Sequence, residues 1–271
     1  MRIPDALKTS QLFPRYWNRE RLALPTAELW EALAHLFFPP VCYYCKAPLD
    51  SRGRQKLCPK CRESLTLTEA PYCLGCSKID VSLDEETLLC PDCQAKSKRA
   101  PLSRVIAGAA YTGLAPHLVS KFKYGNARYL ADPLTDIITS HPEFNVLSPY
   151  IYALVPVPMH WAKRLIRGYN QAEDLAYELS RRTKIPVVKA LKRTRYQSPQ
   201  ASLSREARMR NLLGAFQFDK RYAKYFRNQP KHMITAVIDD VCTTGTTAEL
   251  CARQLKYAGA KNIILLTVAK T

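Results

Sequence analysis

The chain has 271 residues, a formal net charge of +18 and a hydrophobic content of 47%. This length suffices for one medium domain and a small module, and nearly half of the residues are available for a core. No apolar run reaches the length of a membrane-spanning helix, and the first residues do not resemble a signal peptide. We therefore expect a cytoplasmic protein.

The positive charge is concentrated in the second part of the chain. Residues 1–100 hold 15 basic and 12 acidic residues, whereas residues 101–271 hold 26 and 11. Between Arg181 and Lys231 there are 15 bases and only two acids. This bias favours a polyanionic partner, either nucleic acid or, as the weaker alternative, an anionic membrane surface. A merely solvated basic surface is the alternative without a partner.

A polar tail and an expected helix occupy residues 1–40, and a cysteine-rich module follows. Its four Cys-x-x-Cys pairs are Cys42 and Cys45, Cys58 and Cys61, Cys73 and Cys76, and Cys90 and Cys93. Two such pairs complete a tetrahedral Cys₄ zinc site. Disulfides are disfavoured in a cytoplasmic chain, and iron–sulfur ligation is a weaker alternative. Sequential pairing predicts two structural zinc ions in a double zinc ribbon, although the spacing also permits interleaved pairs.

After a linker at residues 94–103, strand patterns alternate with helix patterns. We expect strands at residues 105–111, 151–158, 186–191, 234–238 and 262–268, and helices at residues 115–122, 130–139 and 171–182. Residues 192–211 are polar and basic, which indicates a loop. The alternation predicts an α/β domain with a mainly parallel sheet and helices on both faces. The predicted domains are 1–40 (tail and helix), 41–98 (double zinc ribbon) and 99–271 (α/β domain).

The stretch from Ile234 to Thr247 carries the most specific chemistry. A buried strand is followed by Asp239 and Asp240, a loop rich in threonine, and a helix. A loop that opens a helix offers unpaired N–H groups to a phosphate, and Gly245 lets the backbone approach it. Paired carboxylates can bind vicinal ribose hydroxyls or hold Mg²⁺ through water. The alternative is a capping box formed by Thr246 and Glu249.

This stretch resembles the phosphoribosyl-pyrophosphate (PRPP) signature of type I phosphoribosyltransferases. The resemblance implies that Asp239 and Asp240 bind the ribose hydroxyls, in a site that takes PRPP with Mg²⁺. It implies that the 5′-phosphate is held by Thr243, Thr244, Gly245, Thr246 and Thr247. Arg164 and Arg167 follow a strand end, and arginine suits bidentate contact with phosphate. We expect these two to meet pyrophosphate; charge on a helix surface is the alternative.

Further motifs narrow the family. They are the segments 121–124, 155–160, 164–171 and 191–216, together with the cysteine pairs. The chain resembles the ComF family of competence-associated, phosphoribosyltransferase-like proteins. This implies N-terminal zinc, a PRPP-type site and the handling of single-stranded DNA during natural transformation. Its implied partners are single-stranded DNA, PRPP or a ribose 5-phosphate compound, and competence helicase or recombination proteins, and a peripheral position at the inner face of the membrane is compatible with it. Gln197 and Cys242 depart mildly from the family pattern.

The basic stretch supplies the predicted DNA contacts. We expect single-stranded DNA to meet Arg193, Arg195, Arg205, Arg208 and Arg210, because two acids cannot pair so many cations. The nearby rings of Tyr222, Tyr225 and Phe226 either stack on bases or pack a short helix. A phosphoribosyltransferase that uses PRPP and Mg²⁺ on an unknown acceptor is the alternative function, and a pure zinc-ribbon adaptor is a third. The sequence assigns no catalytic residue.

Overall fold

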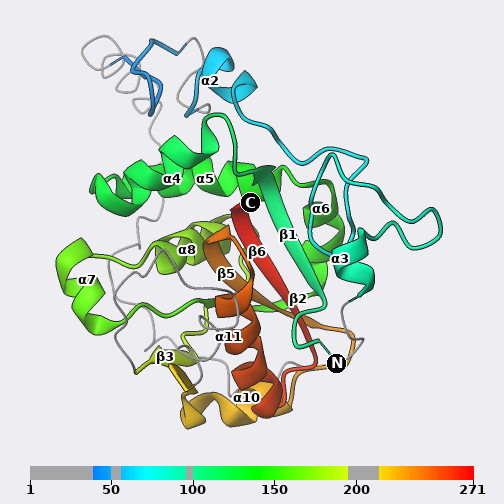
Figure 1. Ribbon diagram of the computed structural model, residues 1–271. Helices are drawn as coiled ribbons and strands as arrows, with labels where there is room; N and C mark the ends of the chain where they lie inside the picture. Colours follow the sequence, from blue (N-terminus) through cyan, green and yellow to red (C-terminus); the bar gives the residue numbers. More distant parts are fainter. Residues whose placement is uncertain (1–38, 50–55, 96–99, 195–213) are drawn as a thin grey trace, which may run out of the picture. The chain divides into compact units, whose positions relative to one another are not determined.

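The computed structural model describes residues 39–49, 56–95, 100–194 and 214–271 (Figure 1). Residues 41–271 form one compact unit. Its centre is a parallel sheet in the strand order β1-β6-β5-β2. The strands are β1 (Arg104–Ala110), β2 (Ile151–Pro156), β5 (Ile234–Cys242) and β6 (Asn262–Lys270). The predicted α/β class with a mainly parallel sheet is confirmed.

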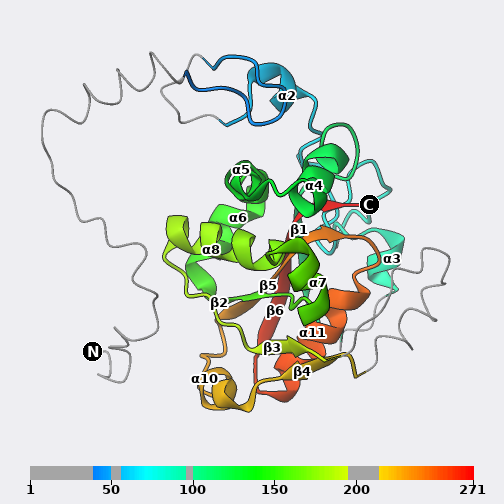
Figure 2. The ribbon, with the colours of Figure 1, turned by 90° about the vertical axis from the view of Figure 1, so that its left-hand side faces the viewer.

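Helices cover both faces of the sheet, as Figure 2 shows for α5 and α8 on one side and α11 on the other. The first face carries α4 (Ala115–Tyr124), α5 (Ala131–Thr139) and α8 (Gln171–Thr183). The second carries α11 (Thr246–Tyr257), α10 (Ala223–Arg227) and the hairpin of β3 (Leu191–Arg193) and β4 (Phe216–Phe218). Successive strand residues point to opposite faces, so Ile264 joins the first core and Leu265 the second.

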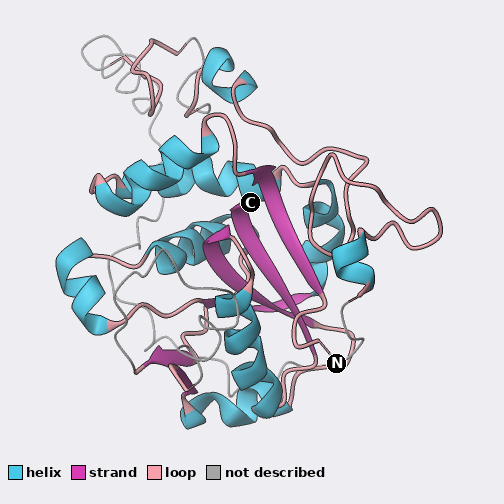
Figure 3. Ribbon diagram, in the orientation of Figure 1, coloured by secondary structure: helices cyan, strands magenta, loops and turns pink. Residues whose placement is uncertain are grey.

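The remaining elements are short. They are α2 (Pro59–Glu63), α3 (Pro91–Gln94), α6 (Pro142–Leu147), α7 (Trp161–Arg167), η3 (Arg128–Leu130), η4 (Ser148–Tyr150) and η5 (Lys220–Tyr222). Figure 3 shows that the cysteine-rich module is mostly loop, with one short helix in each half. In the described part of the chain, no helix is both long and apolar enough to cross a membrane. The helix expected within residues 1–40 lies outside the described residues.

Several expected boundaries differ from the structure, and three of these differences bear on the site. The strand expected at residues 186–191 is reduced to one parallel bridge between Val187 and Leu154, because the chain then turns away from β2. The hairpin strand β3 begins at Leu191 instead, so Lys192 and Arg193 lie in a strand and not in a loop. The strand expected to end at Ile238 continues to Cys242, since pairing with β6 extends past the acidic residues.

The cysteine-rich module packs directly against the edge strand β1. Thr68 donates its backbone N–H to Gly108, and Ala110 donates to Thr66, which adds a short antiparallel segment beside β1. Leu67 and Ala109 form the bridge between them. An uncovered edge strand invites pairing with other chains. The segment between the two cysteine clusters therefore protects this edge of the sheet.

Candidate functional sites

The eight predicted ligands form two separate clusters. The first contains Cys42, Cys45, Cys58 and Cys61, and the second contains Cys73, Cys76, Cys90 and Cys93. Within each cluster the sulfur atoms all lie within 4.8 Å of one another. The pairs therefore combine sequentially, as predicted, and the interleaved arrangement is wrong.

The sulfur geometry fits zinc. A tetrahedral Zn–S₄ centre with bonds of about 2.3 Å requires sulfur atoms about 3.8 Å apart. The Sγ atoms of Cys45 and Cys58 are 3.6 Å apart, and those of Cys76 and Cys90 are 3.8 Å apart. In each cluster a proline directly after the third cysteine starts a short helix, which carries the fourth cysteine. Both clusters are thus suited to a structural zinc ion.

The acidic pair lies near the carboxyl end of β5, with the two residues facing opposite sides of the sheet. Asp240 is buried, and its Oδ1 is 2.9 Å from Nζ of Lys123 on α4. Asp239 accepts a hydrogen bond from the backbone N–H of Asp240 at 2.9 Å. The pair is therefore held by one ammonium group and by its own backbone.

The pKa values of Asp239 and Lys123 are both raised. Burial, reinforced by the neighbouring charge of Asp240, raises the pKa of Asp239 to about 7. The ion pair with Asp240 outweighs burial and raises the pKa of Lys123. Two acids beside one base leave an excess negative charge in a poorly solvated site, which favours the neutral form of Asp239. Such a shift is typical of sites that bind a cation or a ligand.

The threonine loop connects β5 to α11. Gly245 has a φ of +78° and forms the N-cap of α11, without any side-chain cap hydrogen bond. The capping-box alternative is therefore wrong. Thr246 is buried, and its Oγ1 lies 2.9 Å from Oγ1 of Thr244. Thr243 and Thr244 are exposed at the tip of the loop. The first turn of this twelve-residue helix has no side-chain cap, and it carries one acid, Glu249.

The segment from Arg164 to Gln171 contains the turn between α7 and α8. Gly168, with a φ of +77°, ends α7, and Asn170 begins α8 by accepting a hydrogen bond from Ala172. The hydroxyl of Tyr169 donates to the carbonyl of Phe122 on α4. These contacts fix the turn between the two helices. The turn directs Arg167 and Gln171 toward the same cavity.

This cavity has a volume of about 360 Å³. It is lined by residues that include Lys123, Tyr124, Arg167, Asn170, Gln171, Asp239, Asp240 and Thr243. The predicted residues Asp239, Asp240, Thr243 and Arg167 are therefore brought together. Arg164 does not line the cavity; it forms an ion pair with Glu173 at 3.1 Å. Thr244, Gly245, Thr246 and Thr247 also do not line it; the first two belong to the adjoining loop and the last two to the start of α11.

Sequence reasoning missed several residues of this cavity. Lys123 was noted only within a family motif, and no role followed from it. Gln171 is buried, its Oε1 accepts a hydrogen bond from Arg167 at 3.2 Å, and its Nε2 has no partner among the described residues. A buried donor without a partner is costly, so this amide favours a ligand with an oxygen acceptor. Only the folded arrangement reveals it.

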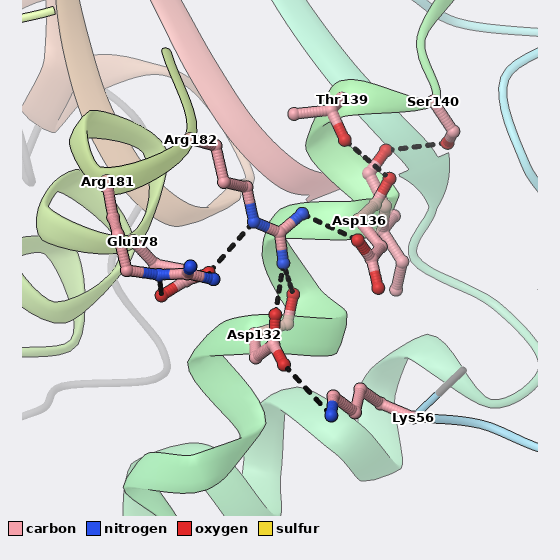
Figure 4. Close-up of polar contacts among 9 residues, drawn as sticks. Lys56, Asp132, Asp136, Thr139, Ser140, Glu178, Arg181 and Arg182 are labelled. Atoms are coloured by element: carbon pink, nitrogen blue, oxygen red, sulfur yellow. Dashed lines mark hydrogen bonds and ion pairs between the residues drawn. The ribbon is translucent and has the colours of Figure 1, made fainter. Parts of the chain in front are cut away.

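Much of the described basic stretch is engaged within the protein. Figure 4 shows Arg182 between α8 and α5, where its guanidinium bonds to Glu178, Asp132 and Asp136. Arg181 also pairs with Glu178, at 2.6 Å. These bonds outweigh burial and lower the pKa of Glu178. Arg182 thus links α8 to α5, whereas Arg181 pairs within α8.

The rings of this stretch are packed. Phe226 is fully buried, and Tyr225 lies against Tyr152 with ring centroids 4.6 Å apart. The packing alternative is therefore confirmed for these two rings. Arg193 is half-buried beside Phe216, at 5.4 Å from the ring centroid, and its buried Nε has no hydrogen-bond partner among the described residues. Arg195, Arg205, Arg208 and Arg210 lie outside the described residues.

Comparison with known proteins supports the resemblance to the ComF family. Residues 33–94 match the family model of the double zinc ribbon domain. The chain is 28% identical to Competence protein F of Haemophilus influenzae, over 86% of this chain and 98% of that protein. It is 27% identical to DNA utilization protein YhgH of Escherichia coli K12, over 87% and 99%. Competence protein ComFC of Bacillus subtilis is 25% identical, over 76% and 80%. The resemblance to the ComF family is confirmed.

Solved structures offer a distant likeness. A chain described as the allosteric regulatory enzyme of purine biosynthesis aligns with a TM-score of 0.31 and 15% identity. The alignment covers 52% of this chain and 25% of that one.

Proposed function

We propose that this ComF-like protein handles single-stranded DNA during natural transformation and binds PRPP, or another ribose 5-phosphate compound, in the cavity beside Asp239. The names of its relatives, Competence protein F and DNA utilization protein, support the cellular role. The ligand proposal is supported by the cavity, because that site combines paired acids, two cations and an open loop.

The ligand proposal depends on the cavity having both acidic and basic side chains in its lining. Asp239 and Asp240 offer acceptors for two sugar hydroxyls, and Thr243 leads into a helix N-terminus that suits a terminal phosphate. Arg167 supplies a guanidinium for pyrophosphate. The carboxylates would also hold Mg²⁺, directly or through water, and the ion would offset pyrophosphate charge. The cavity together with the adjoining threonine loop would thus offer a partner for each part of PRPP.

Turnover of PRPP is the alternative to binding alone. Displacement of pyrophosphate at the anomeric carbon needs the same cradle, with Arg167 and Lys123 offsetting the charge of the leaving group. The presence of both acidic residues in the cavity supports this hypothesis. Release of pyrophosphate in the presence of nucleobases or nucleic acids would establish it, and PRPP binding without release would exclude it for those acceptors.

Calorimetry with PRPP and Mg²⁺ tests the ligand site. We expect the double variant Asp239→Ala and Asp240→Ala to lose binding, because no acceptor for the ribose or the metal remains. A matched control removes the same charge from the exposed loop residues Glu85 and Glu86, and it should bind as the original protein does. Equal affinity in all three proteins would refute the site.

The DNA proposal is tested through salt dependence. We expect the combined replacement of Arg193, Arg195 and Arg208 by alanine to weaken binding of a single-stranded oligonucleotide. Each lost phosphate contact should reduce the slope of log affinity against log salt by about 0.7. An unchanged slope in a variant with normal zinc content would place the DNA interface elsewhere on the protein.

A further inference from the structure

Helix α7 exposes an unusual amount of apolar surface. None of its seven residues is buried, although it contains tryptophan, leucine and isoleucine. Trp161 is 66% exposed, Leu165 75% and Ile166 80%. So short a helix lacks intrinsic stability, and here two caps hold it, His160 at its start and Gly168 at its end. Exposed apolar groups gathered on one element indicate an interaction surface.

Trp161 is held in place from one side. The ring of His160 lies 5.5 Å from that of Trp161 at an interplanar angle of 38°. His160 is itself buried, and its Nδ1 accepts a hydrogen bond from the backbone N–H of Ala162. The indole thus rests on a fixed support while most of its surface faces solvent. A ring ordered in advance loses little conformational entropy when a planar partner stacks on it.

The helix is cationic, and its last residue, Arg167, lines the ligand cavity. It carries Lys163, Arg164 and Arg167 and no acidic residue. Burial, together with the positive charges of Arg193 and Arg167, lowers the pKa of Lys163. Among the described residues Arg167 has no carboxylate partner; it bonds to the amide of Gln171 and lies 4.7 Å from the ring of Tyr124. Arg164 pairs with Glu173, whereas Lys163 and Arg167 have no carboxylate partner among the described residues.

The described part of the basic stretch has exposed cations, such as Lys220 and Lys224, but no comparably exposed ring. Phe226 is buried, and Tyr222 and Tyr225 are partly buried against the second core. In α7, by contrast, an aromatic ring and cations are accessible on one element. Binding of single-stranded nucleic acid requires both, because rings stack on bases while cations neutralise phosphates. Double-stranded DNA would offer α7 the charge without the open bases.

We propose that α7 is a binding surface for single-stranded DNA, on which Trp161 stacks against a base while Lys163 and Arg167 contact the backbone phosphates. This inference rests on the proposed function and identifies the surface that serves it. Because Arg167 and Tyr124 also line the cavity beside Asp239, the bound strand would pass the mouth of the ligand site.

Fluorescence anisotropy with a labelled oligothymidylate tests this proposal on the full-length, zinc-loaded protein. We expect Trp161→Ala to weaken binding about tenfold, with the salt slope unchanged because no charge is lost. Trp161→Phe should retain most of the affinity. Lys163→Ala should reduce the slope by about 0.7. Tyr257→Ala removes a more exposed ring, 86% exposed at the end of α11, and should bind normally.

The outcomes separate the two proposals. If the original protein does not bind the oligonucleotide, the proposed DNA function fails. If the original protein binds and Trp161→Ala matches Tyr257→Ala in affinity, α7 is not the DNA surface and its apolar side chains serve another partner. If Trp161→Ala loses affinity for both the oligonucleotide and PRPP, the substitution disturbs the cavity itself. Its effect on DNA would then not identify α7 as the DNA surface, and the inference would be overturned.

Discussion

Ligand binding at the acidic pair should depend on pH, with a midpoint near neutrality. Burial and the charge of Asp240 raise the pKa of Asp239 to about 7. A protonated Asp239 cannot bind Mg²⁺ and accepts fewer hydrogen bonds from ribose hydroxyls. We therefore expect affinity for PRPP with Mg²⁺ to fall as the pH is lowered from 8 to 6.

The expected size of this effect follows from the fraction that is ionised. With a pKa of about 7, roughly a tenth of Asp239 is ionised at pH 6 and about nine tenths at pH 8. The apparent dissociation constant should therefore be about tenfold higher at pH 6. The midpoint belongs to the pair, because the two carboxylates interact.

Asp239→Asn is the matched control in a calorimetric titration across this range. The ligand phosphate also titrates near pH 6, so the variant reports the contribution of the ligand alone. We expect the variant to bind more weakly and to show a smaller pH dependence than the original protein. Parallel pH profiles in the two proteins would refute the assignment of the raised pKa to Asp239.

The contribution of Asp239 to folding stability should fall as the pH rises, whereas ligand affinity should increase. A carboxyl group with a raised pKa in the folded state stabilises the protein below its unfolded pKa, and this contribution is lost as the pH rises through about 7. Asp239→Asn avoids that loss. The variant should therefore be more stable than the original protein at pH 8, by a few kcal/mol at most, with no comparable gain at pH 4. Urea unfolding at both pH values measures the difference.

Three further predictions concern zinc and the packing of the chain. Elemental analysis should find two zinc ions per chain, and a chelator should lower the melting temperature of the sheet as well, because Thr68 and Ser77 bond to β1. Ser77→Ala removes buried bonds to Val105 and Ala107 and should cost about 2–3 kcal/mol in urea unfolding, against under about 0.5 for the exposed Ser64→Ala. Arg182→Ala removes the bonds from α8 to Asp132 and Asp136, leaves Asp136 without a basic partner among the described residues, and should cost about 1–3 kcal/mol, whereas the 60% exposed Arg181→Ala should cost under about 1.

The elements with strong periodicity could be predicted from the sequence. Apolar runs identified β1, β5 and β6, and helical spacing identified α5 and α8, each within a few residues. The cysteine pairs were predictable because close spacing in the chain forces closeness in space. By contrast, the extension of β5 through Asp239 depends on pairing with Thr267 of β6, which no local pattern encodes.

The composition of the cavity was less predictable than its location. The acidic pair was evident because both residues are adjacent in sequence, whereas Lys123 meets Asp240 across 117 positions, through packing of α4 against the sheet. Arg164 and Arg167 looked equivalent in sequence. In the folded chain Arg164 pairs with Glu173, whereas Arg167, at the end of α7, lines the cavity.

The same turn explains why the two proposed ligands would meet. Gly168 ends α7 at the residue after Arg167, and the hydroxyl of Tyr169 fixes the chain to α4. The exposed ring of Trp161 and the cavity are thereby linked through one seven-residue helix. A strand bound along α7 would bring its phosphates close to Arg167, the cation proposed to meet pyrophosphate. Polyanionic DNA and PRPP should then compete for this guanidinium, and saturating oligothymidylate should weaken PRPP binding in the original protein but not in Arg167→Ala.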